Sequence, residues 1–425
     1  MSERLDWRVS RRKLLTGSAA AGAGLVGLGI VGCGDDDDSA KKTATGGTTA
    51  PATTSGEFKL TGDLNIGMVS SFTGPLATIY APFSAGAKLA IEEINAKGGI
   101  AGAKINFVQA DDQSNPANVP AATLGLLDKK VNFCLGPIGS NAIVASDALN
   151  KAKIMQFGYS DNPDLANTSK FPYSFRYVWS PEQSSKLIVD WYKKQGWDKV
   201  AILAENTVYG QTDAPATEKY MKSIGMTPTL FEYFQPGTAD FTPLLRKCED
   251  AKTQAIVWWT QGGPEGVSVI RNIDSLKSKM VLGGIGLFAF GLAGAVSQET
   301  LDKTYSFQWK RTTYTDSEPV GAKVKALRDN LAAKGADWLG PTGSGVSPFY
   351  DMVYHLKAAI EGAKSTESTA VVKWMEKNPF DGAMANYTGI TDKDHTVTDV
   401  SQITMAILGS LDQKNLPFYK RAPGL

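Results

Sequence analysis

The chain of 425 residues contains few of the residues that define several classes of protein. It has three cysteines and two histidines (His355 and His395), too few for a disulfide framework or a histidine-rich metal site. Its 44 basic and 43 acidic side chains balance, so no basic excess indicates a nucleic-acid partner. We therefore expect no metal, no cofactor and no nucleic acid. The composition is that of a globular chain large enough for two compact cores.

Long apolar runs are absent as well. The apolar stretch from about Ser18 to Gly32 would be about 22 Å long as a helix, short of a hydrocarbon core of about 30 Å. Because Arg11, Arg12 and Lys13 precede it, residues 1–33 are predicted to be an export signal rather than a spanning helix. The arginine pair resembles the twin-arginine motif, with Leu14 where that motif prefers Phe.

The end of this signal resembles a lipobox, Ile30-Val31-Gly32-Cys33, in which the cysteine becomes a lipid-modified N-terminus. The resemblance implies an extracytoplasmic protein anchored to the cell membrane by a lipid on Cys33, on the periplasmic face if the envelope is Gram-negative. Residues 34–56 are mostly Asp, Thr, Ala, Gly, Ser and Lys, with too few apolar groups to fold. We expect them to form a disordered tether.

From residue 64 onward, short apolar runs alternate with amphipathic helical patterns, which predicts parallel sheets covered by helices on both faces. In such sheets ligands bind beyond the carboxyl ends of the strands, and the segments there hold no cluster of catalytic side chains. The predicted strands are 64–69, 103–110, 131–135, 154–158, 200–204 and 255–259, and the predicted helices are 82–97, 141–151, 214–223, 266–273 and 350–362.

Several short motifs occur in a characteristic order, and together they resemble the branched-chain amino acid (Leu/Ile/Val-type) substrate-binding proteins of ABC importers. The resemblance extends from about residue 60 to the C-terminus. The motifs are Phe72-Thr73-Gly74-Pro75, the run 90–102, the run 111–116, Gly136-Pro137 with Ser140, Tyr209-Gly210, and Asp240-Phe241.

This resemblance implies a type I periplasmic binding protein: an α/β chain with two doubly wound parallel-sheet lobes, joined by a three-stranded hinge. The implied boundaries are 57–178 plus 306–378 for the first lobe and 179–305 plus 379–425 for the second.

The implied function is capture of a small carboxylate-bearing ligand, a branched-chain or other amino acid, between the lobes. A monomer would deliver it to an ABC permease in the cytoplasmic membrane, without chemistry on the ligand. A sensor using the same closure is an alternative. An enzyme in the same cleft is disfavoured, because neither histidine lies near a Ser- or Cys-bearing strand end.

Three candidate ligand-binding residues match polar positions of the family. Ser140 matches the serine that binds a ligand carboxylate at a helix N-terminus, although an ordinary helix cap would also explain it. Tyr159 and Asp161 match a second binding loop, where the family uses a backbone carbonyl and a threonine-type hydroxyl. Asp161 departs from that pattern: its carboxylate would attract an ammonium group, or would close a turn before Asn162-Pro163.

Tyr80 and Tyr209 match aromatic residues on opposite walls of the family's site, where a ring packs on the ligand body. Core packing is the alternative for each. Gln261 is a candidate at the end of a strand, after Trp258-Trp259, of which at least one is expected in the core.

The segment 284–288 is apolar, whereas amino-acid-binding members carry an acid near it that pairs the ligand's ammonium. Either Asp161 replaces that acid, or the ligand is a hydrophobic or aromatic carboxylic acid or an amide. Separately, Cys134 and Cys248 are expected to be free and buried.

Overall fold

The computed structural model describes residues 58–261, 264–287, 292, 294–335, 338, 348–411 and 418–425. The predicted export signal with Cys33, the tether and Phe288 lie outside these residues. Within them, no helix is both long and apolar enough to cross a bilayer.

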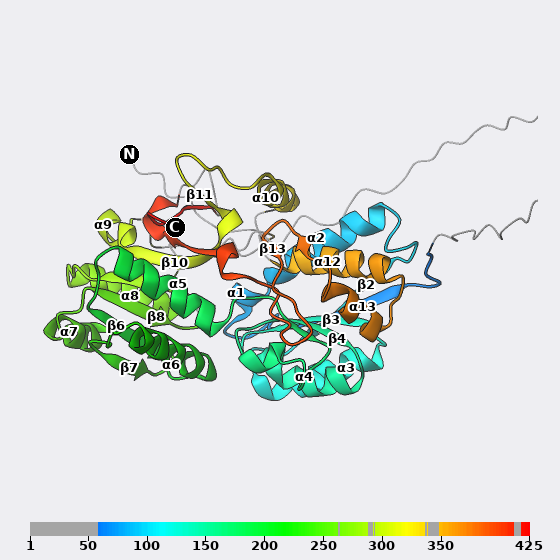
Figure 1. Cartoon of the computed structure of the whole chain (residues 1–425), viewed down its shortest axis with the longest axis horizontal. Helices are drawn as coiled ribbons and strands as arrows, with labels where there is room; N and C mark the ends of the chain where they lie inside the picture. The colour runs from blue at the N-terminus through cyan, green and yellow to red at the C-terminus, as the bar shows by residue number, and fades with distance from the viewer. Residues whose placement is uncertain are drawn as a thin grey trace, which may run out of the picture. The chain divides into compact units, whose positions relative to one another are not determined.

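The first lobe is built on a five-stranded parallel sheet with helices on both faces (Figure 1). The strand order is β2 (Ile105–Asp111), β1 (Leu64–Ser70), β3 (Phe133–Ile138), β4 (Met155–Tyr159) and β5 (Ser174–Arg176). Its described helices are α1 (Ala77–Tyr80), α2 (Phe83–Ala96), α3 (Val119–Asp128), α4 (Asn141–Lys151), α10 (Ala322–Lys334), α12 (Pro348–Ala363) and α13 (Ser368–Met375).

Strand periodicity explains why this sheet has two covered faces. Ile66 and Met68 of β1 belong to the core that includes residues of α2 and α12, whereas Val69 belongs to a separate core with α3 and α4. Successive side chains of a strand point to opposite faces, so an apolar run without polar interruptions requires helices on both.

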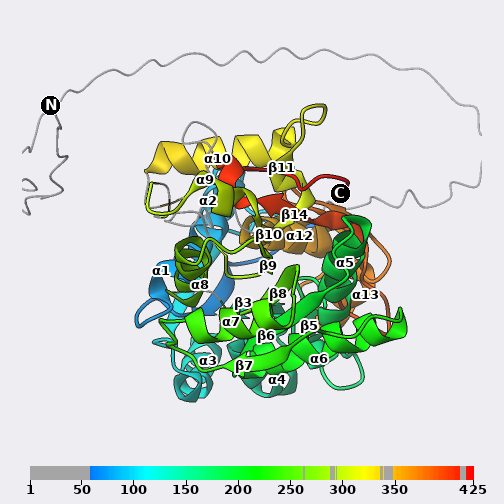
Figure 2. The ribbon, with the colours of Figure 1, turned by 90° about the vertical axis from the view of Figure 1, so that its left-hand side faces the viewer.

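The second lobe is built on a six-stranded sheet, seen from its own side in Figure 2. All neighbouring strands are parallel except β14 and β10, which are antiparallel. The order is β14 (Ile403–Ile407), β10 (Thr304–Trp309), β9 (Val281–Gly284), β8 (Ala255–Trp259), β6 (Val200–Glu205) and β7 (Phe231–Phe234). The helices are α5 (Pro181–Lys194), α6 (Val208–Ser223), α7 (Thr242–Asp250), α8 (Pro264–Ser275) and α9 (Gln298–Asp302).

The two sheets repeat one topology. In each, the second strand of the lobe lies at the edge, the first lies next to it, and the third, fourth and fifth follow on the other side. This is the doubly wound order in which the chain reverses its winding direction between the first and third strands. The predicted fold class, two doubly wound α/β lobes, is confirmed, with the antiparallel β14 as an addition to the second sheet.

Three crossings connect the lobes. The first follows β5 and enters α5, near the predicted boundary at 178–179. The second begins after Trp309, at the end of β10, and passes along β11 (Thr313–Tyr314), which still pairs with β15 (Tyr419–Lys420). The predicted boundary at 305–306 falls inside β10. The third follows β13 (Asn386–Tyr387) and leads to β14, later than the predicted 378–379. Residues 380–387 remain with the first lobe because Asp351 of α12 accepts hydrogen bonds from the backbone N–H groups of Ala383 and Met384.

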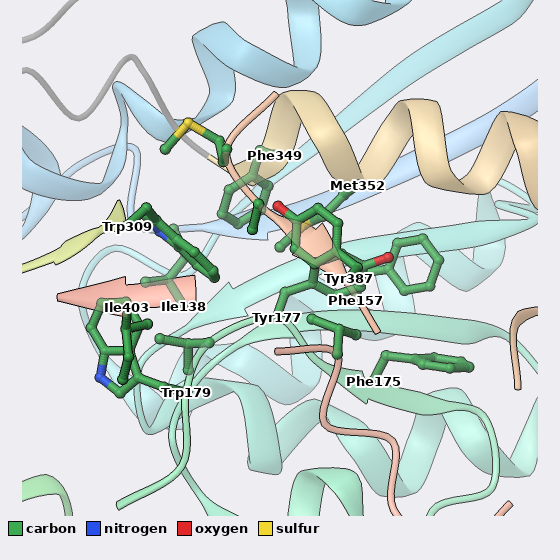
Figure 3. Close-up of a cluster of buried hydrophobic side chains, with 14 of the residues drawn as sticks. Ile138, Phe157, Phe175, Tyr177, Trp179, Trp309, Phe349, Met352, Tyr387 and Ile403 are labelled. Atoms are coloured by element: carbon green, nitrogen blue, oxygen red, sulfur yellow. The ribbon is translucent and has the colours of Figure 1, made fainter. Parts of the chain in front are cut away.

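Each crossing contributes an aromatic side chain to one buried cluster (Figure 3). The ring centroids of Trp179 and Trp309 are 5.4 Å apart, and those of Trp309 and Tyr387 are 6.2 Å apart. Tyr177 continues the cluster into the first lobe, 5.5 Å from Tyr387. The connections between the lobes are therefore packed core rather than exposed linkers.

Both cysteines of the folded lobes are buried and unpaired, as predicted. Cys134 lies in β3 and Cys248 in α7. Burial raises the pKa of each thiol to about 12, so neither has thiolate character at neutral pH.

Candidate functional site

A cavity of about 200 Å³ lies where the carboxyl ends of strands from both sheets meet. The first lobe contributes the end of β3 with Gly139 and the loop that follows β4. The second contributes the residues after β8 and β9, together with the last residues of β10. Because β3 and β8 each border the winding reversal of their sheet, the cavity occupies the position at which doubly wound folds bind ligands.

The structure brings most of the predicted site residues to this one cavity. Tyr80, Tyr159, Asp161, Tyr209 and Gln261 line it. Ser140 does not line it directly but is in contact with Gln261. Residues predicted from opposite halves of the sequence are thus neighbours, while their contact with a ligand stays a prediction.

Gln261 of the second lobe contacts two of these residues, both in the first lobe. Its Nε2 donates to Ser140 Oγ at 3.5 Å, and its Oε1 accepts from the Tyr80 hydroxyl at 3.5 Å, both at the outer limit of a hydrogen bond. Ser140 occupies the cap position of α4, yet its side chain makes no capping hydrogen bond. The Ser140 side chain therefore does not cap the helix. Its hydroxyl contacts Gln261, which lines the cavity.

Asp161 is buried, with 9% of its surface exposed, and it does not close the turn that follows it. That role belongs to Asn162, whose side chain accepts from the backbone N–H of Asp164. Arg176 donates through Nη1 to the main-chain carbonyl of Asp161, at 3.2 Å, and not to its carboxylate. Burial raises the pKa of Asp161, while a hydrogen bond with the Asp213 carboxyl and the charge of Arg176 lower it.

Tyr209 lies in the first turn of α6, which begins at Val208 rather than at the predicted residue 214. The Thr207 side chain caps this helix by accepting from the backbone N–H of Gly210. The additional turn places Asp213 four residues after Tyr209, on the same face of the helix. Asp213 is 1% exposed and was not among the predicted site residues.

Aromatic residues that the sequence did not single out form much of the remaining wall. Trp179 lines the cavity from the first crossing, and Phe83 lines it from α2. Phe307 and Trp309 line it from β10, and Trp309 leads into the second crossing. Trp309 ends β10, a strand that is not among those predicted from the sequence. With that strand, the rule that ligands bind at the carboxyl ends of strands points to Trp309. Trp258 and Trp259 do not line the cavity: the first stacks on Phe234 in the core of the second lobe, and the second on Phe307.

The described part of the cavity wall carries almost no charge. Of the described residues that line it, only Asp161 carries a charge. The segment after β9 contributes Ile285 and Gly286, in keeping with its apolar sequence. The cavity can therefore stabilise one positive group of a ligand at Asp161, while the aromatic rings pack against an apolar part of the same ligand.

Neither histidine is placed to act as a base in this cavity. His355 is buried in α12, where its Nδ1 lies 2.7 Å from the Tyr177 hydroxyl, and His395 stacks on Phe175 at 4.2 Å. Neither lines the cavity. Among the described residues, no group of three His, Cys, Asp or Glu side chains could hold a metal ion.

Comparisons with known proteins agree with this architecture. A family described as "Periplasmic binding protein" matches residues 63–407. A Leu/Ile/Val-binding protein of Rhizobium johnstonii is 28% identical over 374 residues, which cover 85% of this chain and 92% of that protein.

Two solved structures share the fold. The branched-chain amino acid transporter substrate-binding protein LivJ of Streptococcus pneumoniae, in complex with isoleucine, has a TM-score of 0.66 at 23% identity, covering 85% of this chain and 99% of that one. An ABC transporter solute-binding protein of R. palustris, in complex with 4-hydroxybenzoate, has a TM-score of 0.68 at 19% identity, covering 85% and 96%. With two doubly wound lobes, a cavity at their winding reversals and a family match across both, the chain belongs to the periplasmic binding protein family and has its type I fold.

Proposed function

We propose that the protein captures a small ligand bearing a carboxylate, an amine and an apolar body, such as an amino acid with a hydrophobic side chain, between its two lobes. The observation that carries this proposal is the buried carboxylate of Asp161 in a cavity whose other described walls are uncharged. An amine that binds there gains a charge-assisted hydrogen bond in a desolvated site.

The ligand carboxylate is assigned to the N-terminus of α4. Backbone N–H groups of a first helical turn favour an anion, and the Ser140 hydroxyl is the side chain at that position. A carboxylate there would replace the Gln261 amide as the partner of Ser140. The exchange is favourable because the present contact is long, at 3.5 Å.

The apolar body is assigned to the rings of Tyr80, Tyr159 and Tyr209 and to the two tryptophans of the crossings. The relative from R. johnstonii is named a Leu/Ile/Val-binding protein, and the S. pneumoniae protein was solved with isoleucine. These names support a branched-chain or similar amino acid as the ligand.

A hydrophobic or aromatic carboxylic acid is the second candidate. The apolar segment 284–287 offers no acid to an ammonium group, and the similar fold from R. palustris was solved with 4-hydroxybenzoate. Such a ligand would leave Asp161 without a cationic partner, which is the reason we place it second.

A thermal-shift screen tests the function. We expect branched-chain and aromatic amino acids to raise the melting temperature, because a ligand that binds only the folded state stabilises it by mass action. The screen should include the corresponding deaminated acids, amides and sugars. No shift with any amino acid or carboxylic acid would contradict the proposal, and a shift with the deaminated acids alone would favour the second candidate.

We further propose that the protein is a lipoprotein that delivers its ligand to an ABC permease, on the basis of the signal and lipobox patterns in residues 1–33. Replacing Cys33 with serine removes the thiol that accepts the lipid. We expect this variant to appear in the soluble fraction after cell fractionation, with Cys134→Ser as a control that stays with the membranes. Retention of the Cys33→Ser protein on membranes would rule out the lipid anchor.

A further inference from the structure

The cavity has a second acid behind its wall, on the opposite lobe from Asp161. Asp161 follows β4 of the first lobe, and Asp213 lies on α6 of the second. The two side chains are buried, at 9% and 1% exposed, and they influence each other's pKa as interacting neighbours. Two carboxyl groups form a hydrogen bond only when one of them keeps its proton, so a single shared proton would join the two lobes through this pair.

Apart from this mutual contact, the pair has free hydrogen-bonding capacity. Oδ2 of Asp161 and Oδ2 of Asp213 are both buried, and neither accepts an N–H or O–H hydrogen bond from the described part of the chain. The charge of Arg176 acts on both acids, but its Nη1 donates to the Asp161 carbonyl and its Nη2 donates to Thr396 Oγ1 at 2.5 Å. Its Nε is buried and has no hydrogen-bond partner among the described residues, so no hydrogen bond joins the guanidinium to either carboxyl group there.

Other groups around the pair favour keeping that proton. Among the described residues, Glu182 of α5 and the hydroxyls of Tyr80 and Tyr209 also interact with the pair, and none of these groups is cationic. Burial raises the pKa of Asp213 well above its usual range, the charge of Asp161 raises it further, and Arg176 lowers it. Two carboxylates in contact in a desolvated site repel, so something positive must accompany them.

Only Asp161 reaches the cavity surface; Asp213 lies behind it and does not line the cavity. A ligand amine on the cavity side of Asp161 would supply the same single positive charge that the shared proton supplies. With the amine bound, Asp213 can lose its proton while the summed charge of the two carboxyl groups and the amine stays at minus one. When the bound ligand has no amine, the carboxyl pair has to keep its proton in the closed complex.

We propose that a ligand's ammonium group takes the place of the proton shared by Asp161 and Asp213. The preference of the protein for an amine over its deaminated analogue would then depend on pH through this carboxyl pair. The inference rests on the proposed function and adds Asp213 as a residue that determines specificity without touching the ligand. A complex with an amine then holds one proton fewer on the pair than a complex with its deaminated analogue.

The test compares L-leucine with 4-methylpentanoate, which has the same skeleton without the amine, or L-phenylalanine with 3-phenylpropanoate. Calorimetry gives both affinities between about pH 6 and about pH 8, where the ligand carboxylates and amines do not change charge. The ratio of the amine affinity to the acid affinity should rise about tenfold per pH unit, because the two complexes differ by one bound proton. Both affinities refer to the same ligand-free protein, so any effect of its protonation is equal for the two ligands and cancels in their ratio.

Asp213→Asn is the decisive variant. Its amide N–H can donate to Asp161 as the protonated acid does, but it has no proton to exchange, so the ratio should become independent of pH. Glu218→Gln is the matched control: it removes one carboxylate from α6, at a site paired with Lys222, and should keep the pH dependence of the wild type. The wild-type measurement is decisive even if Asp213→Asn fails to fold.

A wild-type ratio that does not change with pH, or an unchanged slope in Asp213→Asn, would overturn the inference and leave the proposed function standing. If no amine and no acid binds at any pH, the proposed function fails and the inference fails with it. If only the amine binds measurably, its affinity should rise with pH, because its binding releases the proton that the ligand-free pair holds. If only the deaminated acid binds, the inference fails.

Discussion

Replacing Asp161 with asparagine is expected to weaken the binding of an amine-bearing ligand by at least about tenfold, while its deaminated analogue binds within about threefold of the wild type. The amine loses the only charged side chain among the described residues of the cavity wall, and the carboxylate of Asp213 lies behind that wall. A ligand without an amine has no such contact to lose.

Calorimetry on the two ligand classes measures this difference. Asp164→Asn is the matched control: it removes a carboxylate three residues away, which is half-exposed, pairs with Lys170 and does not line the cavity. Equal loss for amines and deaminated acids would show that Asp161 supports the loop rather than the ligand. A better affinity for deaminated acids in the variant would favour the carboxylic acid candidate.

The second large effect is expected on stability. Trp309→Ala should lower the free energy of unfolding by about 3–5 kcal/mol, because it removes a large side chain, only 4% exposed, from the cluster shared by the crossings. Urea denaturation followed by circular dichroism measures the loss. Ligand affinity should fall as well, since the same ring lines the cavity.

Trp309→Phe is the control for this change, because it keeps an aromatic ring against Trp179 and should lose markedly less stability. If the alanine variant loses less than about 1 kcal/mol, the cluster does not hold the crossings together and the packing argument fails.

The architecture of the lobes followed from local patterns. The helix Asn141–Lys151 and the strand Ala255–Trp259 have the predicted bounds. The helix shows an apolar stripe at helical spacing, and the strand is a short, continuous apolar run bounded by polar and turn residues. The start of α6 was placed six residues late: Pro215, typical of a first helical turn, lies inside this helix, which begins after the Thr207 cap. The antiparallel strand β14 has no local signal for its direction, since strand direction depends on which neighbour pairs with it.

The candidate site was predictable where a residue follows a strand and much less so elsewhere. Tyr159, Asp161 and Gln261 all end or follow strands and all line the cavity. Asp213 is not among the predicted site residues because the predicted helix begins at residue 214. Its four-residue spacing from Tyr209 lies on one helix face only because α6 begins at Val208. Trp179 was missed because it lies in a crossing, and the neighbours of a crossing are set by how the two lobes pack rather than by adjacent sequence.

The dual position of β10 constrains how the specificity of this protein can be reprogrammed. The strand pairs within the second sheet, forms part of the cavity floor and leads directly into the second crossing. A substitution in its last residues would alter ligand fit and the resting balance between open and closed forms together. Engineering a biosensor for a new metabolite should therefore vary the loops after β4, β8 and β9, which reach the cavity without carrying the chain from one lobe to the other.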